Sequence, residues 1–211
     1  IESLEPQILL ARADSALEQS KESSTNGCAI YLPELDKNQI QPLKLQNELS
    51  QAISNQQMSL VYQPVVDQAG RLQSVEVLMR WHHPHFGFIS PAKFIAAAEL
   101  TDCIFELELW GLDRVIEVIQ TLNQAQSKVP IMSLNISSRH FHQEHFVSVV
   151  MSRIHAAQID PALLQFELAE DIFVVNTTSA KSKIVELKHH GVNIAMDNFG
   201  GGSCAVHILQ G

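Results

Sequence analysis

Four side chains that could hold a metal ion recur at or near the ends of four short apolar segments. They are Glu76, Asn135, Glu167 and Asp197. Three carboxylates and one amide offer hard oxygen ligands, which suit Mg²⁺ or Mn²⁺ better than zinc. The alternative is that each is a separate polar group with its own local partner. Their recurrence on four segments favours a shared metal site.

The segments that carry these side chains alternate with stretches of helical spacing. We predict strands over residues 60–66, 75–81, 131–136, 164–168 and 192–196, and helices over residues 44–55, 91–100, 105–122, 144–156 and 179–190. Strands that alternate with helices of this length predict an α/β fold with βα units around a mostly parallel sheet. In a β/α barrel, the carboxyl ends of the strands are where the chemistry is assembled.

Composition excludes several classes of protein. The 211 residues are 45% hydrophobic and 18% charged, which is typical of a globular domain that can bury a core. Lys and Arg number 14 against 23 Asp and Glu, a net charge of −9 that disfavours DNA as a partner. Three widely spaced cysteines predict neither a disulfide framework nor a zinc cluster and favour a reducing compartment. No apolar run is long enough to span a membrane, so we expect no membrane contact by this segment. We also expect a cytoplasmic location, and upstream domains could anchor the parent protein in a membrane.

The chain is predicted to contain two parts joined by a linker. Residues 8–20 have helical spacing, Asn26-Gly27 marks a turn, and a short apolar run follows. Residues 1–34 are too few to bury a core of their own, so we interpret them as the end of another domain. Residues 35–42 are polar and end in a proline, as expected of a linker, and residues 43–211 form the main domain.

The main domain contains an ordered series of short motifs. They are Gln63-Pro64, Glu76-Val77-Leu78-Met79-Arg80-Trp81, His83-Pro84, Phe94-Ile95, Ala98-Glu99, Asn135-Ile136-Ser137, Phe166-Glu167-Leu168-Ala169-Glu170 and Asp197-Asn198-Phe199-Gly200. In this order they resemble the EAL domain, the bacterial cyclic di-GMP phosphodiesterase family, from about residue 43 to the last residue. Residues 1–34 resemble the C-terminal end of a GGDEF domain, which commonly precedes EAL domains.

The resemblance to the EAL family implies a fold, a ligand and a role for each matching residue. The fold is a TIM-like (β/α) barrel with one reversed strand, of which this chain is expected to hold about five of eight strands. The ligand is cyclic di-GMP, and the family reaction is its hydrolysis to linear pGpG by two divalent cations. The matching metal ligands are Glu76, Asn135, Glu167 and Asp197, with Gln63 and Arg80 contacting the dinucleotide and Glu170 supporting the loop after Asp197. We also expect a homodimer or an interdomain partner.

The chain departs from the family pattern at several positions. Asn198 replaces the second aspartate of the family's DDFG motif, and the following loop, residues 201–206, differs from the family's almost throughout. The expected catalytic lysine strand would fall beyond Gly211. Two hypotheses follow: a cyclic di-GMP binding module of low or lost activity, and an active phosphodiesterase in the full-length parent. A scaffold that binds only proteins is the third alternative.

Six of the ten histidines fall into two groups that lie between predicted elements. One group is His82, His83 and His85, and the other is His140, His142 and His145. We interpret both groups as loop residues rather than as an additional metal site.

Overall fold

The computed structural model describes residues 42–172 and 177–197, together with positions 13, 16, 17, 20 and 30. The chain divides into two compact units, Ile1–Lys44 and Leu45–Gly211. Apart from those five positions, the segment that resembles a GGDEF domain and the linker before residue 42 lie outside the described residues. The description below therefore concerns the second unit and the helix that leads into it.

The predicted strands and helices are found along the described chain in the predicted order, and they alternate from β4 onward. The strands are β1 (Met58–Val66), β2 (Leu72–His83), β3 (Gly87–Ile89), β4 (Ile131–Ile136), β5 (Leu164–Ala169) and β6 (Asn193–Asp197). The helices are α3 (Pro42–Ala52), α4 (Pro91–Glu99), α5 (Cys103–Gln124), α6 (Ser138–Phe141), α7 (Phe146–Ala157), the 3₁₀ turn η1 (Pro161–Leu163) and α9 (Thr177–His189). The short elements β3, α6 and η1 were not predicted, because three or four residues are too few to show a hydrophobic period.

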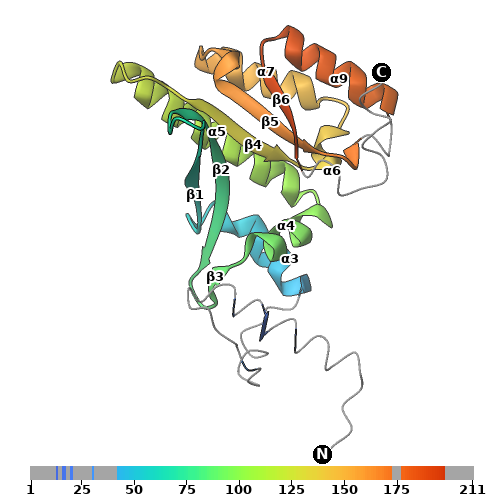
Figure 1. Cartoon of the computed structure of the whole chain (residues 1–211). Helices are drawn as coiled ribbons and strands as arrows, with labels where there is room; N and C mark the ends of the chain where they lie inside the picture. The colour runs from blue at the N-terminus through green and yellow to red at the C-terminus, as the bar shows by residue number, and fades with distance from the viewer. Residues whose placement is uncertain are drawn as a thin grey trace, which may run out of the picture. The chain divides into compact units, whose positions relative to one another are not determined.

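A single sheet joins the strands in the order β1-β2-β4-β5-β6, and β3 pairs with the far end of β2. The pairs β2–β4, β4–β5 and β5–β6 are parallel, whereas β1 runs antiparallel to β2. Figure 1 shows α5, α7 and α9 lying along one side of the sheet. The mixed sheet with its one reversed strand and its covering helices is consistent with part of a TIM-like barrel.

The two faces of the sheet differ in chemistry because side chains alternate along each strand. One face carries the apolar residues that pack against the helices, with Val77, Leu134, Phe166 and Leu168 all buried. These residues and the inward sides of α5, α7 and α9 form one hydrophobic core. The opposite face is therefore the one on which polar side chains can gather.

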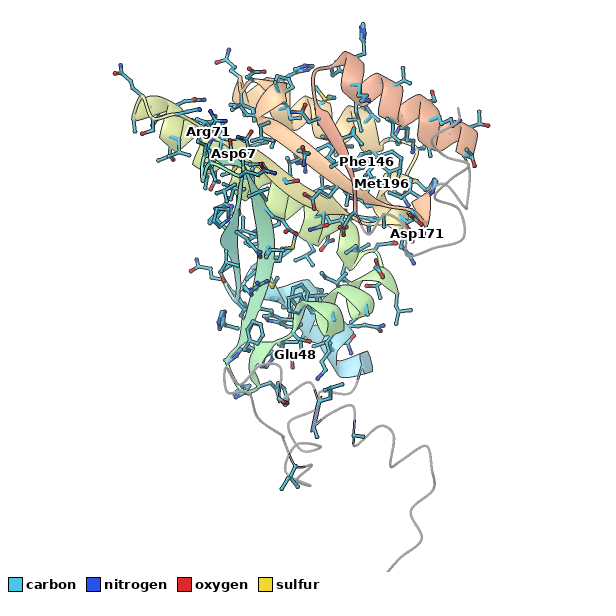
Figure 2. The ribbon with its side chains drawn as sticks, viewed as in Figure 1. Glu48, Asp67, Arg71, Phe146, Asp171 and Met196 are labelled. Atoms are coloured by element: carbon cyan, nitrogen blue, oxygen red, sulfur yellow. The ribbon has the colours of Figure 1, made fainter. Side chains whose placement is uncertain are left out.

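The turn between β1 and β2 is held by Asp67. Its carboxylate accepts hydrogen bonds from the backbone N–H groups of Ala69 and Arg71 and from Nε of Arg71, the last at 2.7 Å. Gly70 has φ +75°, a conformation that glycine adopts without strain. These hydrogen bonds, led by those from Arg71, lower the pKa of Asp67. Figure 2 shows Asp67 and Arg71 side by side at the tip of this hairpin.

Two histidines that the sequence places in loops are buried structural residues instead. His83 lies at the end of β2, where Nδ1 accepts the N–H groups of His85 and Phe86 and Nε2 lies 3.2 Å from Oε2 of Glu48. His140 lies on α6 and is 4% exposed. The interpretation of both groups as loop residues was therefore wrong for these two and for His82, which also lies on β2. Local sequence does not show which distant carboxylate a histidine ring meets.

Candidate functional site

The polar face of the sheet carries the four predicted metal-ligand side chains. The strand pairing places Glu76 beside Ser133, and Asn135 beside Glu167. Asp197 is the last residue of β6 and pairs with Ala169, two residues beyond Glu167 on β5. Because paired residues in a sheet point to the same side, all four project from one face. Glu76 lies in the first half of the long strand β2. The pairing of β2 with β4 nevertheless ends at the next residue, Val77, so Glu76 is near the end of the paired region.

Hydrogen bonds connect these side chains across the strands. Nδ2 of Asn135 donates to Oε1 of Glu76 at 3.1 Å, which joins β4 to β2. Oγ of Ser133 donates to Oε1 of Glu167 at 2.5 Å, and Nε2 of Gln165 donates to the same Oγ at 3.0 Å. The structure therefore brings Glu76 and Asn135 into direct contact and ties Glu167 to the neighbouring strand.

The donor set has the chemistry of a site for a hard divalent cation, since it consists of carboxylate and amide oxygens. Among residues 42–172 and 177–197, however, no three His, Cys, Asp or Glu side chains are gathered closely enough to hold a metal ion. Two of the carboxylates are instead engaged by Asn135 and Ser133. The predicted ligands thus share a face and neighbouring strands, but they do not form a preassembled cage.

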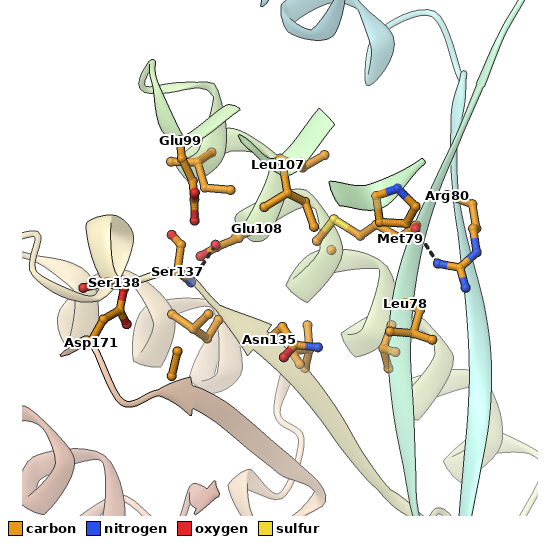
Figure 3. Close-up of a pocket in the computed structure, with 18 residues that line it drawn as sticks. Leu78, Met79, Arg80, Glu99, Leu107, Glu108, Asn135, Ser137, Ser138 and Asp171 are labelled. Carbon is orange, nitrogen blue, oxygen red and sulfur yellow. Dashed lines mark hydrogen bonds between the residues drawn. The ribbon is translucent and has the colours of Figure 1, made fainter. Parts of the chain in front are cut away.

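A pocket of about 450 Å³ opens beside this face, between β2, β4 and the helices α4 and α5. Its walls are mostly apolar, including Leu78, Met79, Ile95 and Leu107. Polar groups also line it, among them Arg80, Asn135, Ser137, Ser138, Glu99, Glu108 and Asp171. Figure 3 shows Glu99, Glu108 and Ser137 grouped on one wall and Arg80 across from them on β2. A pocket with apolar walls and a few polar groups is the usual form of a small-molecule site.

The two predicted substrate-binding residues lie on the same face as the carboxylates. Gln63 of β1 pairs directly with Glu76. Arg80 lies four residues beyond Glu76 on β2, and its Nη1 donates to the backbone oxygen of Met79 at 2.8 Å (Figure 3). One of the five guanidinium N–H groups is used in this contact, so the remaining donors of its fork can serve a phosphate.

Glu108 of α5 is a site residue that sequence reasoning missed. The side chain is buried, and Oε1 accepts the N–H of Ser137 at 2.8 Å while Oε2 lies 2.7 Å from Nδ1 of His140. Ser137 caps α6 by accepting the N–H of His140, and it follows Asn135 by two residues. Glu108 therefore anchors the turn that leads from Asn135 into α6. The available signal was an acid within the apolar run Leu107 to Leu112, where a partner is required.

Two predicted site residues remain, Asn198 and Glu170. Asn198 lies outside the described residues, as does the loop over residues 201–206. Glu170 lies in the turn directly after β5. The roles of these two residues stay predictions, as do the metal-binding and substrate-binding roles of the six residues on the polar face.

Acidic groups at the edge of the pocket influence one another. Partial burial raises the pKa of Glu99, and the negative charges of Glu108 and Asp171 raise it further. Arg139 lies nearby, donating to the backbone oxygen of Glu99 and to Oδ1 of Asp102. The positive charge of Arg139 is thus held next to Asp102 rather than to the Glu99 carboxylate.

Comparison with known proteins identifies the family. The sequence profile of the EAL domain matches residues 46–210, and the chain belongs to this family. This confirms the resemblance that the motifs from Gln63 to Gly200 indicate.

The curated relatives include a cyclic di-GMP phosphodiesterase and an oxygen sensor protein. The chain is 29% identical over 203 residues to the cyclic di-GMP phosphodiesterase NbdA of Pseudomonas aeruginosa, covering 96% of this chain and 26% of that protein. It is 30% identical over 195 residues to the oxygen sensor protein DosP of Escherichia coli, covering 92% of this chain and 24% of that protein. The chain thus spans about a quarter of the length of these relatives.

Solved structures share the fold. The PaMucR phosphodiesterase in complex with c-di-GMP matches with a TM-score of 0.74 and 28% identity, over 79% of this chain and 68% of that one. The FimX EAL domain matches with a TM-score of 0.71 and 21% identity, over 79% of this chain and 67% of that one. The PaMucR phosphodiesterase is similar to this chain in both sequence and fold, whereas the similarity to the FimX EAL domain shows the fold alone.

Among the described helices, none combines the length and the apolar character needed to cross a membrane.

Proposed function

We propose that this chain is the EAL domain of a cyclic di-GMP signalling protein and that it binds cyclic di-GMP more readily than it hydrolyses it. The observation that carries the proposal is the polar face that bears Glu76, Asn135 and Glu167 beside the pocket lined by Arg80. The similarity to NbdA and to the PaMucR complex supports cyclic di-GMP as the ligand.

Binding rests on groups that suit a cyclic dinucleotide. A guanidinium forks onto phosphate oxygens with two parallel hydrogen bonds, and Arg80 provides one at the edge of the pocket. Gln63, opposite Glu76, adds an amide that can donate or accept. The apolar walls of the pocket provide surface against which a base can pack.

A divalent cation, Mg²⁺ or Mn²⁺, would be held by Glu76, Asn135, Glu167 and Asp197. When bound, such an ion polarises phosphoryl oxygens and lowers the pKa of an attacking water. The protein's own contribution is to present these oxygens from one face of a rigid sheet. Nδ2 of Asn135 donates to Glu76, so Oδ1 of the same amide is the atom that would serve the cation.

Weakened turnover is proposed on the strength of Asn198. At this position the family motif has an aspartate, so an amide removes one negative charge from the side of the second cation. Hard dications depend strongly on the charge of their ligands, so the second ion binds less tightly. The second candidate function is an active phosphodiesterase, which the shared face of Glu76, Asn135, Glu167 and Asp197 favours.

A binding titration with cyclic di-GMP beside a chromatographic assay for linear pGpG, each with Mg²⁺ and with Mn²⁺, tests the proposal. We expect binding without rapid turnover. Arg80→Ala should weaken binding about tenfold or more, since a charge-assisted contact is worth roughly 1.5–3 kcal/mol. Arg71→Ala is the matched control, because it removes the same charge at the opposite end of β2.

The remaining outcomes separate the alternatives. Rapid release of pGpG by the unmodified chain would establish the active enzyme instead. No binding of cyclic di-GMP under any condition would leave only a role in protein interaction. Asn198→Asp should tighten the weaker of two Mn²⁺ sites, and two equally tight sites in the unmodified chain would contradict the assignment of Asn198.

The unit that precedes the EAL domain is proposed to be the C-terminal end of a GGDEF domain. The support for this is the pattern of residues 8–34.

A further inference from the structure

Ser133 is an unusual residue for its position in the sheet. It lies in the middle of β4 with apolar neighbours on both sides, Met132 and Leu134, and it is 1% exposed. A hydroxyl removed from water in this way costs free energy unless it is hydrogen-bonded. The Ser133 hydroxyl makes two hydrogen bonds, and both of its partners are on β5.

The direction of each hydrogen bond follows from the chemistry of the groups. An ionised carboxylate only accepts, so the Ser133 hydroxyl donates its single proton to Oε1 of Glu167. A hydroxyl oxygen whose proton is used in this way can still accept, and Nε2 of Gln165 donates to it at 3.0 Å. The three side chains therefore form a hydrogen-bond relay, in which Gln165 donates to Ser133 and Ser133 donates to Glu167.

The strand pairing makes this relay rigid. Ser133 pairs with Gln165 across the parallel ladder, and Glu167 follows Gln165 by two residues on the same face. All three side chains thus extend from adjacent backbone positions that the sheet hydrogen bonds already fix. Because Ser133 has almost no access to water, its hydroxyl has no solvent partner that competes with Glu167.

A carboxylate with one oxygen anchored cannot rotate freely about its terminal bond. Its second oxygen is then presented in one direction before any ligand arrives, so less conformational freedom is lost on binding. Carboxylates that bind metals are usually held by such hydrogen bonds from a second layer of residues, and removing those partners typically weakens metal binding about 10–100-fold.

We propose that Ser133, oriented by Gln165, is a positioning residue that fixes the Glu167 carboxylate for a divalent cation. This inference rests on the proposed function, because it assigns Glu167 to the cation site. Ser133 itself does not contact the cation. The relay explains why a strand whose neighbouring residues are apolar keeps a hydroxyl at this position.

Mn²⁺ binding to the full chain tests the relay, measured by calorimetry and by the electron paramagnetic resonance of free Mn²⁺. Ser133→Ala should weaken Mn²⁺ binding about tenfold. Ser133→Thr keeps the hydroxyl and should recover most of the affinity, which a purely space-filling role would not explain. Gln165→Leu should act in the same direction as Ser133→Ala with a smaller effect, since it removes only the donor that orients the hydroxyl.

Ser74→Ala is the matched control. Ser74 lies on the same face of the sheet, on β2 beside Ile131, and it is two residues from Glu76. We expect its Mn²⁺ affinity to equal that of the unmodified chain. Unfolding by urea is measured for every variant, so that a loss of affinity is compared only among folded proteins.

The outcomes separate this inference from the proposed function. If the unmodified chain binds no Mn²⁺, the cation site fails and the relay loses its role with it. If the unmodified chain binds Mn²⁺ and Ser133→Ala binds it equally well, the relay is overturned while the proposed function stands. Equal losses from Ser133→Ala and Ser74→Ala would likewise overturn it, because the effect would not depend on the contact with Glu167.

Discussion

The carboxylate of Glu108 on α5 lies 2.7 Å from Nδ1 of His140 on α6, and both side chains are 6% exposed. The same carboxylate accepts the N–H of Ser137. The imidazole of His140 packs against the rings of Phe105 and Phe146, at centroid distances of 5.2 and 4.9 Å. Helix α5, which packs on the apolar face of the sheet, therefore holds the turn that follows Asn135, whose own side chain lies on the polar face.

Breaking this pair should destabilise the fold. Glu108→Ala leaves the N–H of Ser137 and Nδ1 of the buried His140 without their partner, and each unsatisfied buried group costs about 1–3 kcal/mol, so we expect a loss of about 3 kcal/mol. Glu108→Gln should lose less, because its amide oxygen can still accept the N–H of Ser137. The free energy of unfolding in urea is the measurement.

Glu117→Ala is the control for this helix. Glu117 is exposed and pairs with Arg114, a surface ion pair worth no more than about 1 kcal/mol. A loss for Glu108→Ala no larger than that of Glu117→Ala would show that the contact with His140 does not stabilise the fold.

The raised pKa of Glu99 predicts a dependence of stability on pH. Burial, followed by the charges of Glu108 and Asp171, makes the folded chain bind the Glu99 proton more tightly than the unfolded chain does. Stability is therefore lost as the pH rises from the ordinary Glu value through the higher folded value. Glu99→Gln removes this loss, so it should stabilise the protein at neutral pH, by up to roughly 0.5 kcal/mol because the group is only partly buried.

The gain from Glu99→Gln should disappear below about pH 4, where the carboxyl is protonated in both states. Urea unfolding at several pH values measures it. Glu106→Gln serves as the control, because Glu106 is in the first turn of α5, where a negative charge is favourable. A pH-independent gain at Glu99 would contradict the electrostatic cause.

The close approach of α5 to β2 depends on Gly111. A Cβ at this position would lie 2.7 Å from Cε of Met79, the flexible end of a side chain that lines the pocket. Gly111→Ala gains about 1 kcal/mol of helix propensity, and moving the Met79 methyl offsets part of this. We therefore expect a change in stability within about 1 kcal/mol.

Gly111→Leu should cost about 1–3 kcal/mol, because its larger side chain must displace more than the end of Met79. Thermal or urea unfolding of both variants decides the question. Equal stability of the alanine and leucine variants would show that the contact between α5 and β2 is looser than the distance indicates.

Much of this architecture follows from the alternation of residues along the chain. The strand over residues 131–136 is found with its predicted bounds, and the other predicted strands and helices within 42–197 differ from the observed ones by at most three residues at either end. Period-two and period-3.6 patterns are visible in the local sequence, so these elements can be predicted from it. The shared face of Asn135 and Glu167 also follows, since neighbouring parallel strands bring equivalent positions together.

The partners of buried polar groups could not be predicted in the same way. Glu48 and His83 are 35 residues apart, and Glu108 and His140 are 32 apart. Local spacing carries no information about which helix packs beside which turn, so these histidines resembled loop residues. Ser133 was likewise indistinguishable from a solvent-facing serine, because its burial depends on the packing of the neighbouring strands.

His83 provides the last prediction, because both of its ring nitrogens are used. Nδ1 accepts the N–H groups of His85 and Phe86, so the ring proton is on Nε2, which donates to Glu48. This arrangement fastens the β2–β3 hairpin to α3.

His83→Ala leaves two N–H groups without their acceptor and removes a buried ring, and we expect a loss of about 2–3 kcal/mol in the free energy of unfolding. His83→Asn places Oδ1 near the position of Nδ1 and should recover part of this loss, whereas His85→Ala, at an exposed position in the same turn, should change stability by less than about 0.5 kcal/mol. Equal losses for the alanine and asparagine variants in urea unfolding would show that the ring stabilises the hairpin by packing alone.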